Sequence, residues 1–580
     1  MHRKEAICPM ATVNIKINGK PIQARPGITV LDAAKEAGID IPTLCHHPAL
    51  ANIGACRLCL VEVAKQRTLQ PACTFPISEG MEVETESPKA VEARKFVLEM
   101  LFSERNHYCM YCEMSGDCEL QAMAYRYGLD HWTYPTPFPK MPVDGTRKYF
   151  IMDHNRCILC RRCIRACSDL VANHTLGVRF RGAKTMISAD MDAPFGESSC
   201  VSCGTCLQVC PTGALIDRKS AYMGREVHVE HTASACTFCS VGCGTSIVTR
   251  AGRVLRVEGD WDAPNQGVLC VAGRFEPLYD TRERLTSPML RKGNALVPIT
   301  WDEALDVLVA RAKGNNGKKT AAYATSNALN DALGAFLTVF QGKVHATVGV
   351  LEPTLEELDL PAGGTLADLD AADCILVAGG DLLADHRVLG YRIKRALDKG
   401  ARLLVVADGA NGMLPFAHRK FPMAELAEAV KICQGSVAPV VIYGSQLDRA
   451  DARKLATLTG KARFIPLFPG VNGYRARELG LKDGLRANGA KVLYLLLGDK
   501  ELPEDAVKEA RRAAFLVVHA AYKSAAAETA DLVLPAPLWY EQEGTFTALD
   551  GRKAVVRPAV PRPADVLTEA EVLARLAERL

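Results

Sequence analysis

The sequence predicts a multidomain protein of the α+β and α/β classes, in which small cysteine-rich domains precede a larger α/β domain. The chain has 580 residues, which is too long for a single hydrophobic core. Nineteen of its 22 cysteines fall into five spaced sets before residue 271. Beyond residue 300, apolar runs such as CILVAGG and RLLVVAD alternate with helical stretches, which is the rhythm of a parallel α/β sheet.

The composition gives no support to two classes of protein, those that bind nucleic acid and those that span a membrane. A net charge of +4 gives no argument for a nucleic-acid partner, and no run of eighteen apolar residues predicts a membrane span. The first ten residues include Arg3 and Lys4 but no apolar segment, so we expect no secretory signal. We therefore expect a cytoplasmic protein, in which clustered cysteines bind metal. Met10 begins a second plausible start (MATVNIKING), which would make residues 1–9 and Cys8 optional.

The first domain begins with a predicted β-hairpin. Apolar and polar residues alternate in VNIKI, and Asn18-Gly19 follows as a strong turn signal. Thr29 is suited to cap a short helix (VLDAAKEA) that Gly38 ends, and a cysteine-rich loop comes next. Two strands, a helix and a cysteine loop predict a β-grasp ferredoxin.

The later elements follow from periodicity and turn chemistry. Residues 88–104 and 121–127 have helical patterns, whereas the proline-rich segment 132–145 is typical of a linker. REVHVEH and SIVTRAGRVLRVEG are expected to be strands around the fifth cysteine set. APVVIYG, KVLYLLLG and AFLVVHA continue the parallel α/β pattern.

The first two cysteine sets differ in what they can bind. Cys45, Cys56, Cys59 and Cys73 are spaced C-x10-C-x2-C-x13-C, which differs from the plant-type spacing but, behind a β-grasp pattern, predicts a 2Fe-2S site. The second set, Cys109, Cys112 and Cys118, lacks a fourth cysteine for a 4Fe-4S cluster, and His107 is the candidate fourth ligand. Alternatively, His107 is an exposed loop residue, and water or another side chain closes the site.

The third and fourth sets repeat one motif. Cys157, Cys160, Cys163 and Cys167 form C-x2-C-x2-C-x3-C, and Cys200, Cys203, Cys206 and Cys210 repeat it before Pro211. In two-cluster ferredoxins the fourth cysteine of each run ligates the other cluster. We therefore assign Cys210 to the cluster of the first run and Cys167 to the cluster of the second. Zinc sites do not use three evenly stepped cysteines plus a fourth, twice over.

The fifth set, Cys236, Cys239, Cys243 and Cys270, has the spacing C-x2-C-x3-C-x26-C. Four cysteines can also bind a zinc ion, but the glycine-rich GVLCVAGR around Cys270 favours a fourth 4Fe-4S cluster. Cys374 and Cys433 lie in or beside apolar segments of the α/β half and are expected to be core residues.

Longer stretches of the sequence resemble a known family. The first half resembles the large iron-sulfur subunit of respiratory complex I and its relatives in NAD-linked hydrogenases and formate dehydrogenases. The stretches similar to the cluster modules of these subunits are TVLDAAKEAGIDIPTLCHHPAL, NHYCMYCEMSGDCELQ, RCILCRRCIRAC and CVSCGTCLQVCPTGAL. CSVGCGTSIVTRAGRVLRVEG, ITWDEAL and ADLVLPAPLWYEQEGTFTALDGR resemble the molybdopterin-oxidoreductase domain of such subunits. The resemblance covers most of the chain.

Two departures from the family refine this interpretation. The familiar complex I pattern has its histidine at the position of Arg105, whereas His107 looks more like the diaphorase-linked small subunit of NAD-reducing hydrogenases. Formate dehydrogenases of the family carry a lysine where this chain has Ala272, and a cysteine or selenocysteine on the metal, but no cysteine lies between Cys270 and Cys374. We therefore expect the molybdopterin-type domain to be a scaffold without molybdopterin.

Together, the motifs and the resemblance predict five domains. These are a β-grasp 2Fe-2S ferredoxin domain (10–88), a 4Fe-4S module with one histidine and three cysteine ligands (89–131), a two-cluster 4Fe-4S ferredoxin domain (146–225), a 4Fe-4S domain of molybdopterin-oxidoreductase type (228–285) and a truncated α/β domain like that of molybdopterin oxidoreductases (286–580). The α/β half lacks a G-x-G-x-x-G motif, so NAD(H) and FMN should bind to a partner flavoprotein.

The resemblance implies further partners and a function. The partners are a small 2Fe-2S subunit and hydrogenase, formate dehydrogenase or quinone-module subunits. The expected location is the cytoplasm, with attachment to the cytoplasmic face of a membrane through partners as an option. We expect an electron-transferring subunit of an NADH dehydrogenase-type complex, with no catalytic residue of its own. The alternatives are a subunit of a soluble NAD-linked hydrogenase, with or without electron bifurcation, a molybdenum or tungsten formate dehydrogenase, and a zinc-stapled scaffold without redox function.

Overall fold

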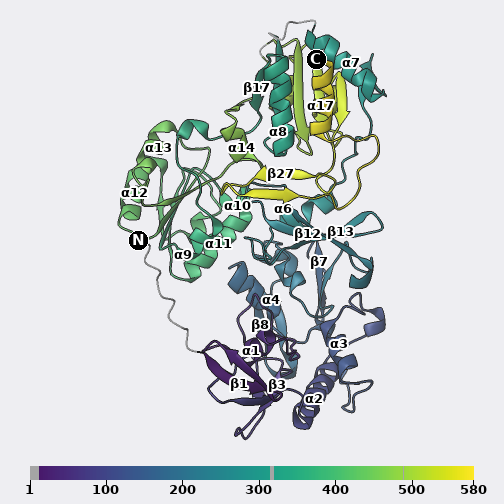
Figure 1. Ribbon diagram of the computed structural model, residues 1–580, viewed down its shortest axis with the longest axis vertical. Helices are drawn as coiled ribbons and strands as arrows, with labels where there is room; N and C mark the ends of the chain where they lie inside the picture. Colours follow the sequence, from purple (N-terminus) through teal and green to yellow (C-terminus); the bar gives the residue numbers. More distant parts are fainter. Residues whose placement is uncertain (1–11, 314–318, 488) are drawn as a thin grey trace. The chain divides into compact units, whose positions relative to one another are not determined.

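The computed structural model describes residues 12–313, 319–487 and 489–580. The chain divides into two compact units, residues 1–228 and 229–580, which we describe separately (Figure 1). Residues 1–9 and Cys8, interpreted above as optional, lie outside the described residues. Within the described part of the chain, no helix has the length and apolar character needed to cross a membrane.

The first unit begins with a mixed five-stranded sheet in the order β2-β1-β5-β3-β4. Its strands are β1 (Val13–Ile17), β2 (Lys20–Ala24), β3 (Leu60–Val63), β4 (Gln70–Pro71) and β5 (Glu82–Glu84). The predicted hairpin of β1 and β2 is confirmed, and it turns at Asn18 and Gly19, whose φ angles are 52° and 73°. The predicted cap is also confirmed: the Thr29 hydroxyl accepts a hydrogen bond from the Asp32 N–H at the start of α1 (Val30–Glu36).

Two helices connect this sheet to the second cysteine set. Helix α2 (Pro88–Glu104) begins after the cap residue Ser87, and α3 (Glu119–Arg126) follows the set. Both helices occur where the sequence pattern predicted them. Leu98 and Phe102 of α2 pack into a cluster that also contains Leu44 of the first cysteine loop, so the helix is anchored beside that loop.

The repeated cysteine motif lies between two strands that pair with each other. Strand β7 (Phe150–Asp153) is antiparallel to β10 (Leu215–Asp217), which ties together the two ends of the repeat. The other elements are β6 (Val143–Asp144), α4 (Arg162–Arg165), β8 (Leu176–Arg179), β9 (Met186–Ala189) and α5 (Thr205–Gln208).

The second unit begins with an antiparallel sheet of β11 (Glu230–Ala235), β12 (Gly244–Arg250) and β13 (Arg253–Gly259). The strand predicted for REVHVEH is wrong in its first half, because Glu226–His228 form a 3-10 turn. Val227 is 82% exposed, so the alternation there has no core to face, and alternation alone does not make a strand.

The predicted β-α-β rhythm of the α/β half belongs to two sheets. The eight-stranded sheet, in the order β15-β14-β26-β25-β24-β16-β17-β23, contains β14 (Met289–Lys292), β15 (Ala295–Pro298), β16 (Thr320–Ala324), β17 (Thr347–Val350), β23 (Lys482–Asp483), β24 (Val492–Gly498), β25 (Leu516–Ala520) and β26 (Leu532–Pro535). The parallel five-stranded sheet, in the order β20-β19-β18-β21-β22, contains β18 (Cys374–Ala378), β19 (Arg402–Val406), β20 (Arg419–Phe421), β21 (Pro439–Tyr443) and β22 (Arg463–Pro466). A hairpin, β27 (Gly544–Thr547) and β28 (Lys553–Val556), completes the unit.

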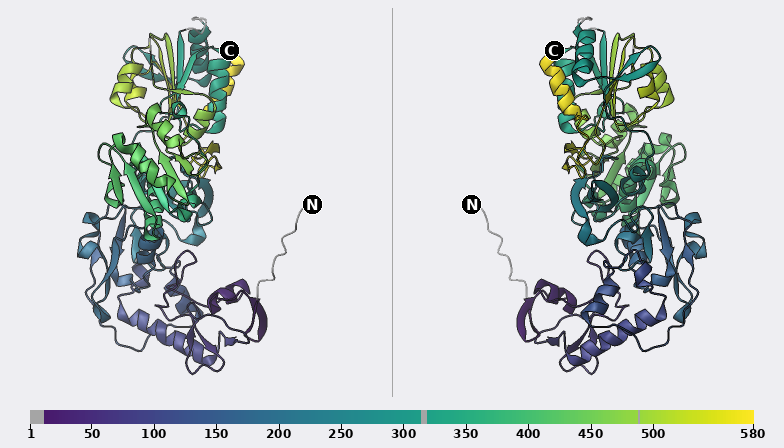
Figure 2. Two further views of the ribbon diagram at one scale, coloured as in Figure 1. Left: turned by 90° about the vertical axis from the view of Figure 1, so that its left-hand side faces the viewer. Right: turned by 90° about the vertical axis from the view of Figure 1, so that its right-hand side faces the viewer.

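Helices cover both faces of the eight-stranded sheet. One face packs against α7, α8 and α17 through residues such as Leu305, Leu333 and Leu573, and Figure 2 shows the yellow α17 beside the teal helices. The opposite face packs against α15 and α16. The helices of this unit are α6 (Val271–Arg274), α7 (Trp301–Lys313), α8 (Asn330–Leu337), α9 (Leu366–Ala371), α10 (Leu382–Asp385), α11 (Arg387–Asp398), α12 (Leu426–Gln434), α13 (Arg449–Ala456), α14 (Gly473–Glu478), α15 (Glu504–Ala510), α16 (Ala525–Thr529) and α17 (Glu569–Arg579).

The two cysteines predicted to be core residues are confirmed as such. Cys374 in β18 and Cys433 in α12 are both fully buried, and their sulfur atoms lie 3.6 Å apart. They take no part in the five sets.

Candidate iron-sulfur sites

The first set is formed by the loop after α1 and the turn after β4. Cys45, Cys59 and Cys73 are buried and Cys56 is half-buried. The thiols of Cys45 and Cys56 contact each other, and so do those of Cys59 and Cys73. These contacts lower the pKa of Cys45 to about 5 and also lower the pKa of Cys73. The same contacts raise the pKa of Cys56 and Cys59, so one thiol of each pair ionises more readily than the other. Thiolates are the form that binds iron.

The second set and His107 line one pocket at the start of α3, together with Phe102, Leu120 and Gly213. Burial lowers the pKa of His107 to about 4, so its imidazole is neutral near pH 7. Its Nε2 lies 3.1 Å from the Leu101 carbonyl, to which it donates, and this leaves Nδ1 as the atom that can bind a metal. A Cβ on Gly213 would lie 2.5 Å from the Cys112 sulfur, so only glycine fits this wall.

The third and fourth sets are interleaved in space. Cys157, Cys160, Cys163 and Cys210 line a single cavity, and the charge of a Cys210 thiolate raises the pKa of the other three. Cys167 instead interacts with Cys200, Cys203 and Cys206. Burial is the largest cause of the raised pKa values in both groups, so the thiolates need a cation to compensate them.

The two runs also repeat one backbone conformation. Leu159 and Arg161 have φ angles of 53° and 58°, and the equivalent Ser202 and Gly204 have 52° and 70°. In both runs the resulting turn directs an N–H group at the first cysteine, since Leu159 N lies 3.4 Å from the Cys157 sulfur and Ser202 N lies 3.4 Å from the Cys200 sulfur. Such N–H groups stabilise negative charge on the ligand sulfur.

The fifth set lies in the second unit, at the edge of the β11-β12-β13 sheet. Cys236 directly follows β11, and its N–H donates to the Cys243 carbonyl (2.8 Å), while Cys270 caps α6. The Cys236, Cys239 and Cys270 thiols influence one another electrostatically, and burial is the main reason for their raised pKa values. Among the residues that the structure describes, no group of three or more His, Cys, Asp or Glu side chains is arranged around a single metal ion. Metal analysis is therefore the direct way to separate iron clusters from zinc.

The crevice beside the fifth set does not fit molybdopterin. Ligands of open α/β sheets bind at the carboxyl ends of the strands, and here Thr325 after β16 and Gly498 of β24 line that place next to Thr237. The cavity measures only about 10 Å³, roughly the room for one water molecule. It also contains Asp499 and Glu569, and burial raises the pKa of Glu569 to about 7.

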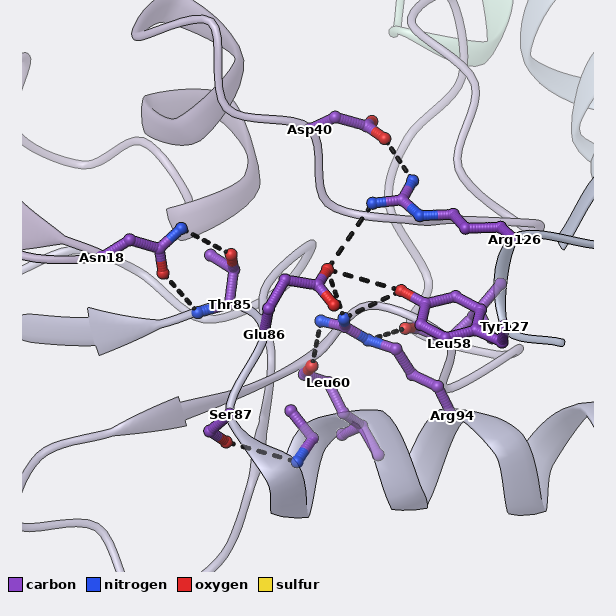
Figure 3. Close-up of polar contacts among 11 residues, drawn as sticks. Asn18, Asp40, Leu58, Leu60, Thr85, Glu86, Ser87, Arg94, Arg126 and Tyr127 are labelled. Carbon is purple, nitrogen blue, oxygen red and sulfur yellow. Dashed lines mark hydrogen bonds and ion pairs between the residues drawn. The ribbon is translucent and has the colours of Figure 1, made fainter.

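Two buried arginines contact the first ligand loop, although sequence reasoning did not single them out. Arg94 donates to the carbonyls of Leu58 and Leu60, on either side of Cys59 (Figure 3). Arg165 donates to the Cys45 carbonyl. These contacts span 36 and 120 positions of the chain, so no local pattern could have identified them.

Comparison with known families gives five matches along the chain. Residues 10–88 match a 2Fe-2S iron-sulfur cluster binding domain, 94–132 the NADH-ubiquinone oxidoreductase-G iron-sulfur binding region, 149–216 the ferredoxin-like domain of NADH-quinone oxidoreductase subunit 3, 229–278 the molybdopterin oxidoreductase Fe4S4 domain, and 284–579 molybdopterin oxidoreductase. The last match spans about half of the chain.

Individual relatives agree with these matches. An NADH-quinone oxidoreductase subunit of Rhizobium meliloti is 31% identical, over 68% of this chain and 48% of that protein, so the chain spans less than two thirds of it. NADH-quinone oxidoreductase subunit 3 of Thermus thermophilus is 29% identical over 98% and 83%, and the alpha subunit of a Geobacter sulfurreducens NADPH-Fe(3+) oxidoreductase 26% over 98% and 81%. A chain in the crystal structure of an NAD+-reducing [NiFe]-hydrogenase is 35% identical over 37% of this chain and 91% of that one, with a TM-score of 0.35.

Proposed function

Because the chain belongs to the molybdopterin oxidoreductase family and carries the iron-sulfur regions of NADH-quinone oxidoreductase subunits, we propose that it is the electron-transferring iron-sulfur subunit of an NADH dehydrogenase-type complex. It would relay electrons between a partner flavoprotein that binds NAD(H) and FMN and a downstream acceptor. The observation that carries this proposal is the shared cavity of Cys157, Cys160, Cys163 and Cys210, because crossed ligation is a property of paired 4Fe-4S clusters.

We assign one 2Fe-2S and four 4Fe-4S clusters to the five sets. The 2Fe-2S ligands are Cys45, Cys56, Cys59 and Cys73; the 4Fe-4S ligand sets are His107 with Cys109, Cys112 and Cys118; Cys157, Cys160, Cys163 and Cys210; Cys200, Cys203, Cys206 and Cys167; and Cys236, Cys239, Cys243 and Cys270. The five domains predicted from the sequence, with a β-grasp fold for the first and a paired-cluster fold for the third, are part of the same proposal.

The residues of this chain hold, shield and tune the redox centres. Bound iron-sulfur clusters supply one-electron transfer, and their potentials depend on hydrogen bonds and burial. The Leu159 and Ser202 N–H groups stabilise added negative charge, and buried cysteines such as Cys163 and Cys206 are shielded from water. No acid, base or nucleophile is assigned a chemical step, since electrons enter and leave through partners.

The partners follow from the same reasoning. A flavoprotein and a small 2Fe-2S subunit would exchange electrons with the first cluster of the series. Quinone-module or hydrogenase subunits would exchange electrons with the last cluster. The position of His107 favours hydrogenase subunits. A cytoplasmic location, with or without attachment to a membrane through partners, suits the many free thiols. A formate dehydrogenase is disfavoured because the crevice beside the fifth set does not fit molybdopterin.

Metal analysis and EPR spectroscopy of the purified full chain test this function. We expect roughly 18 iron atoms per chain with matching acid-labile sulfide, and reducible signals of both cluster types at low temperature. The absence of reducible signals would refute the proposal. Zinc without iron would indicate the scaffold, and stoichiometric molybdenum or tungsten with pterin would indicate the formate dehydrogenase. Co-purifying nickel-iron subunits would identify a hydrogenase, and membrane subunits a quinone reductase.

Replacing His107 by cysteine tests the fourth ligand of the second set. A thiolate adds negative charge that the neutral imidazole lacks, so the reduction potential of this cluster should fall by about 100 mV or more. An EPR-monitored redox titration measures the change, with the exposed His131→Cys variant as the control. An unchanged potential in His107→Cys would mean that another group closes the site.

A further inference from the structure

The guanidinium group of Arg165 lies between two ligand loops of the first unit. Its Nη2 donates to the carbonyl of Cys45 and lies 3.4 Å from the carbonyl of Cys160, while Nη1 donates to the carbonyl of Ala51. Cys45 belongs to the 2Fe-2S set, and Cys160 belongs to the neighbouring 4Fe-4S set. One side chain therefore contacts the backbone of a ligand residue in each of two proposed sites.

This charge is buried, and among the described residues the guanidinium forms no ion pair. Arg165 is only 7% exposed, and its hydrogen bonds in the described residues all go to backbone carbonyls. Asp169, one helical turn further on, influences its pKa less than the thiols of Cys45 and Cys160 do. The cysteine sets are thus the main negative groups that this guanidinium faces.

Two other buried arginines nearby are neutralised. Arg94 forms an ion pair with Glu86 (2.9 Å), and Arg162 forms a bidentate pair with Glu119 (2.6 and 2.7 Å). A buried charge without such a partner is costly unless another negative charge compensates it. Reduction of a cluster adds that negative charge, which distinguishes Arg165 from both neighbours.

We propose that Arg165 is a positioning residue that joins the 2Fe-2S site to the 4Fe-4S site of Cys157, Cys160, Cys163 and Cys210 and raises the reduction potentials of both. Bound at these two sites, the clusters would supply one-electron transfer between the 2Fe-2S site and the 4Fe-4S site. No bond breaks and no proton moves. Arg165 keeps its charge throughout, and its contacts from the Cys45 carbonyl to the Cys160 carbonyl provide a short route between the ligand loops. This inference rests on the proposed ligand sets.

EPR-monitored redox titrations of the full chain, with Arg165→Gln and Arg165→Lys, test the proposal. In Arg165→Gln, both signals should shift to lower potential by at least a tenfold change in the one-electron equilibrium, about 59 mV. Arg165→Lys retains the positive charge, so both reduction potentials should stay close to those of the unmodified chain. The signal of the Cys236 set is the internal reference and should not move.

Arg94→Gln is the matched control, because Arg94 contacts the same 2Fe-2S loop but no residue of the Cys157 set. It should leave the 4Fe-4S signal unchanged. The proposal is overturned if Arg165→Gln shifts neither signal or only one. It is also overturned if both Arg165 variants lose the clusters, since that would show a purely structural role. A wild-type chain without these signals would instead refute the proposed function.

Discussion

Replacing Cys210 by serine should remove the 4Fe-4S cluster of the Cys157 run, although Cys210 belongs to the other run in the sequence. Cys210 lines the cavity of Cys157, Cys160 and Cys163, so its loss leaves that cluster with three cysteines. We expect roughly four iron atoms fewer per chain if the cluster is lost outright, or about one fewer if a residual cluster on three cysteines loses a single iron. Iron analysis and quantitative EPR measure the loss.

Cys167→Ser is the reciprocal experiment. Cys167 interacts with the thiols of the Cys200 run, so its replacement should affect that cluster and leave the first one intact. The two variants should therefore remove different EPR signals. Loss of the same signal in both variants, or of the signal belonging to each residue's own run, would contradict crossed ligation.

Replacing Arg94 by methionine should destabilise the first ligand loop by about 3 kcal/mol. Arg94 is fully buried in α2 and donates to the Leu58 carbonyl (3.1 Å), the Leu60 carbonyl (2.7 Å) and the Tyr127 hydroxyl (3.0 Å). Figure 3 shows these contacts beside Glu86. Methionine fills similar space but leaves the two carbonyls without their donor. Glu86 is half exposed, so water can solvate its charge and most of the loss comes from the carbonyls.

The urea concentration at which the 2Fe-2S circular dichroism signal disappears measures this effect. A local probe is needed because a chain with several domains does not unfold in two states. Arg25→Met is the control: Arg25 pairs with Glu36 on the surface, where such a pair contributes about 0–1 kcal/mol. Equal midpoints for Arg94→Met and Arg25→Met would show that the carbonyl contacts do not hold the loop.

Local chemistry explains what could be predicted from the sequence. Asn18-Gly19 adopts the turn that its composition favours, Thr29 caps its helix, and α2 runs over the residues with helical periodicity. The spacing of the cysteines predicted which candidate ligands belong together, because the ligands on a loop that surrounds a cluster are separated by only a few residues. The ligand sets themselves stay predictions until metal and spectroscopy test them.

Long-range pairing explains what could not be predicted. The β-α-β rhythm is the same in both sheets of the second unit, and nothing in CILVAGG or KVLYLLLG says that β18 pairs with β19 while β24 pairs with β16. The contacts of Arg165 are of the same kind, since a lone arginine beside cysteines has many possible acceptors. In REVHVEH, alternation lacked a core to face, so its first half did not become a strand.

The close approach of Gly213 to Cys112 has a consequence for the order of maturation. Gly213 lies about a hundred positions after Cys112, and the Glu119 N–H also donates to the Pro211 carbonyl (2.9 Å). One wall of the His107 pocket is thus made by the end of the repeated motif. During synthesis, this pocket cannot close until the ribosome has delivered that later segment, so iron inserted earlier would meet an open, solvent-exposed site.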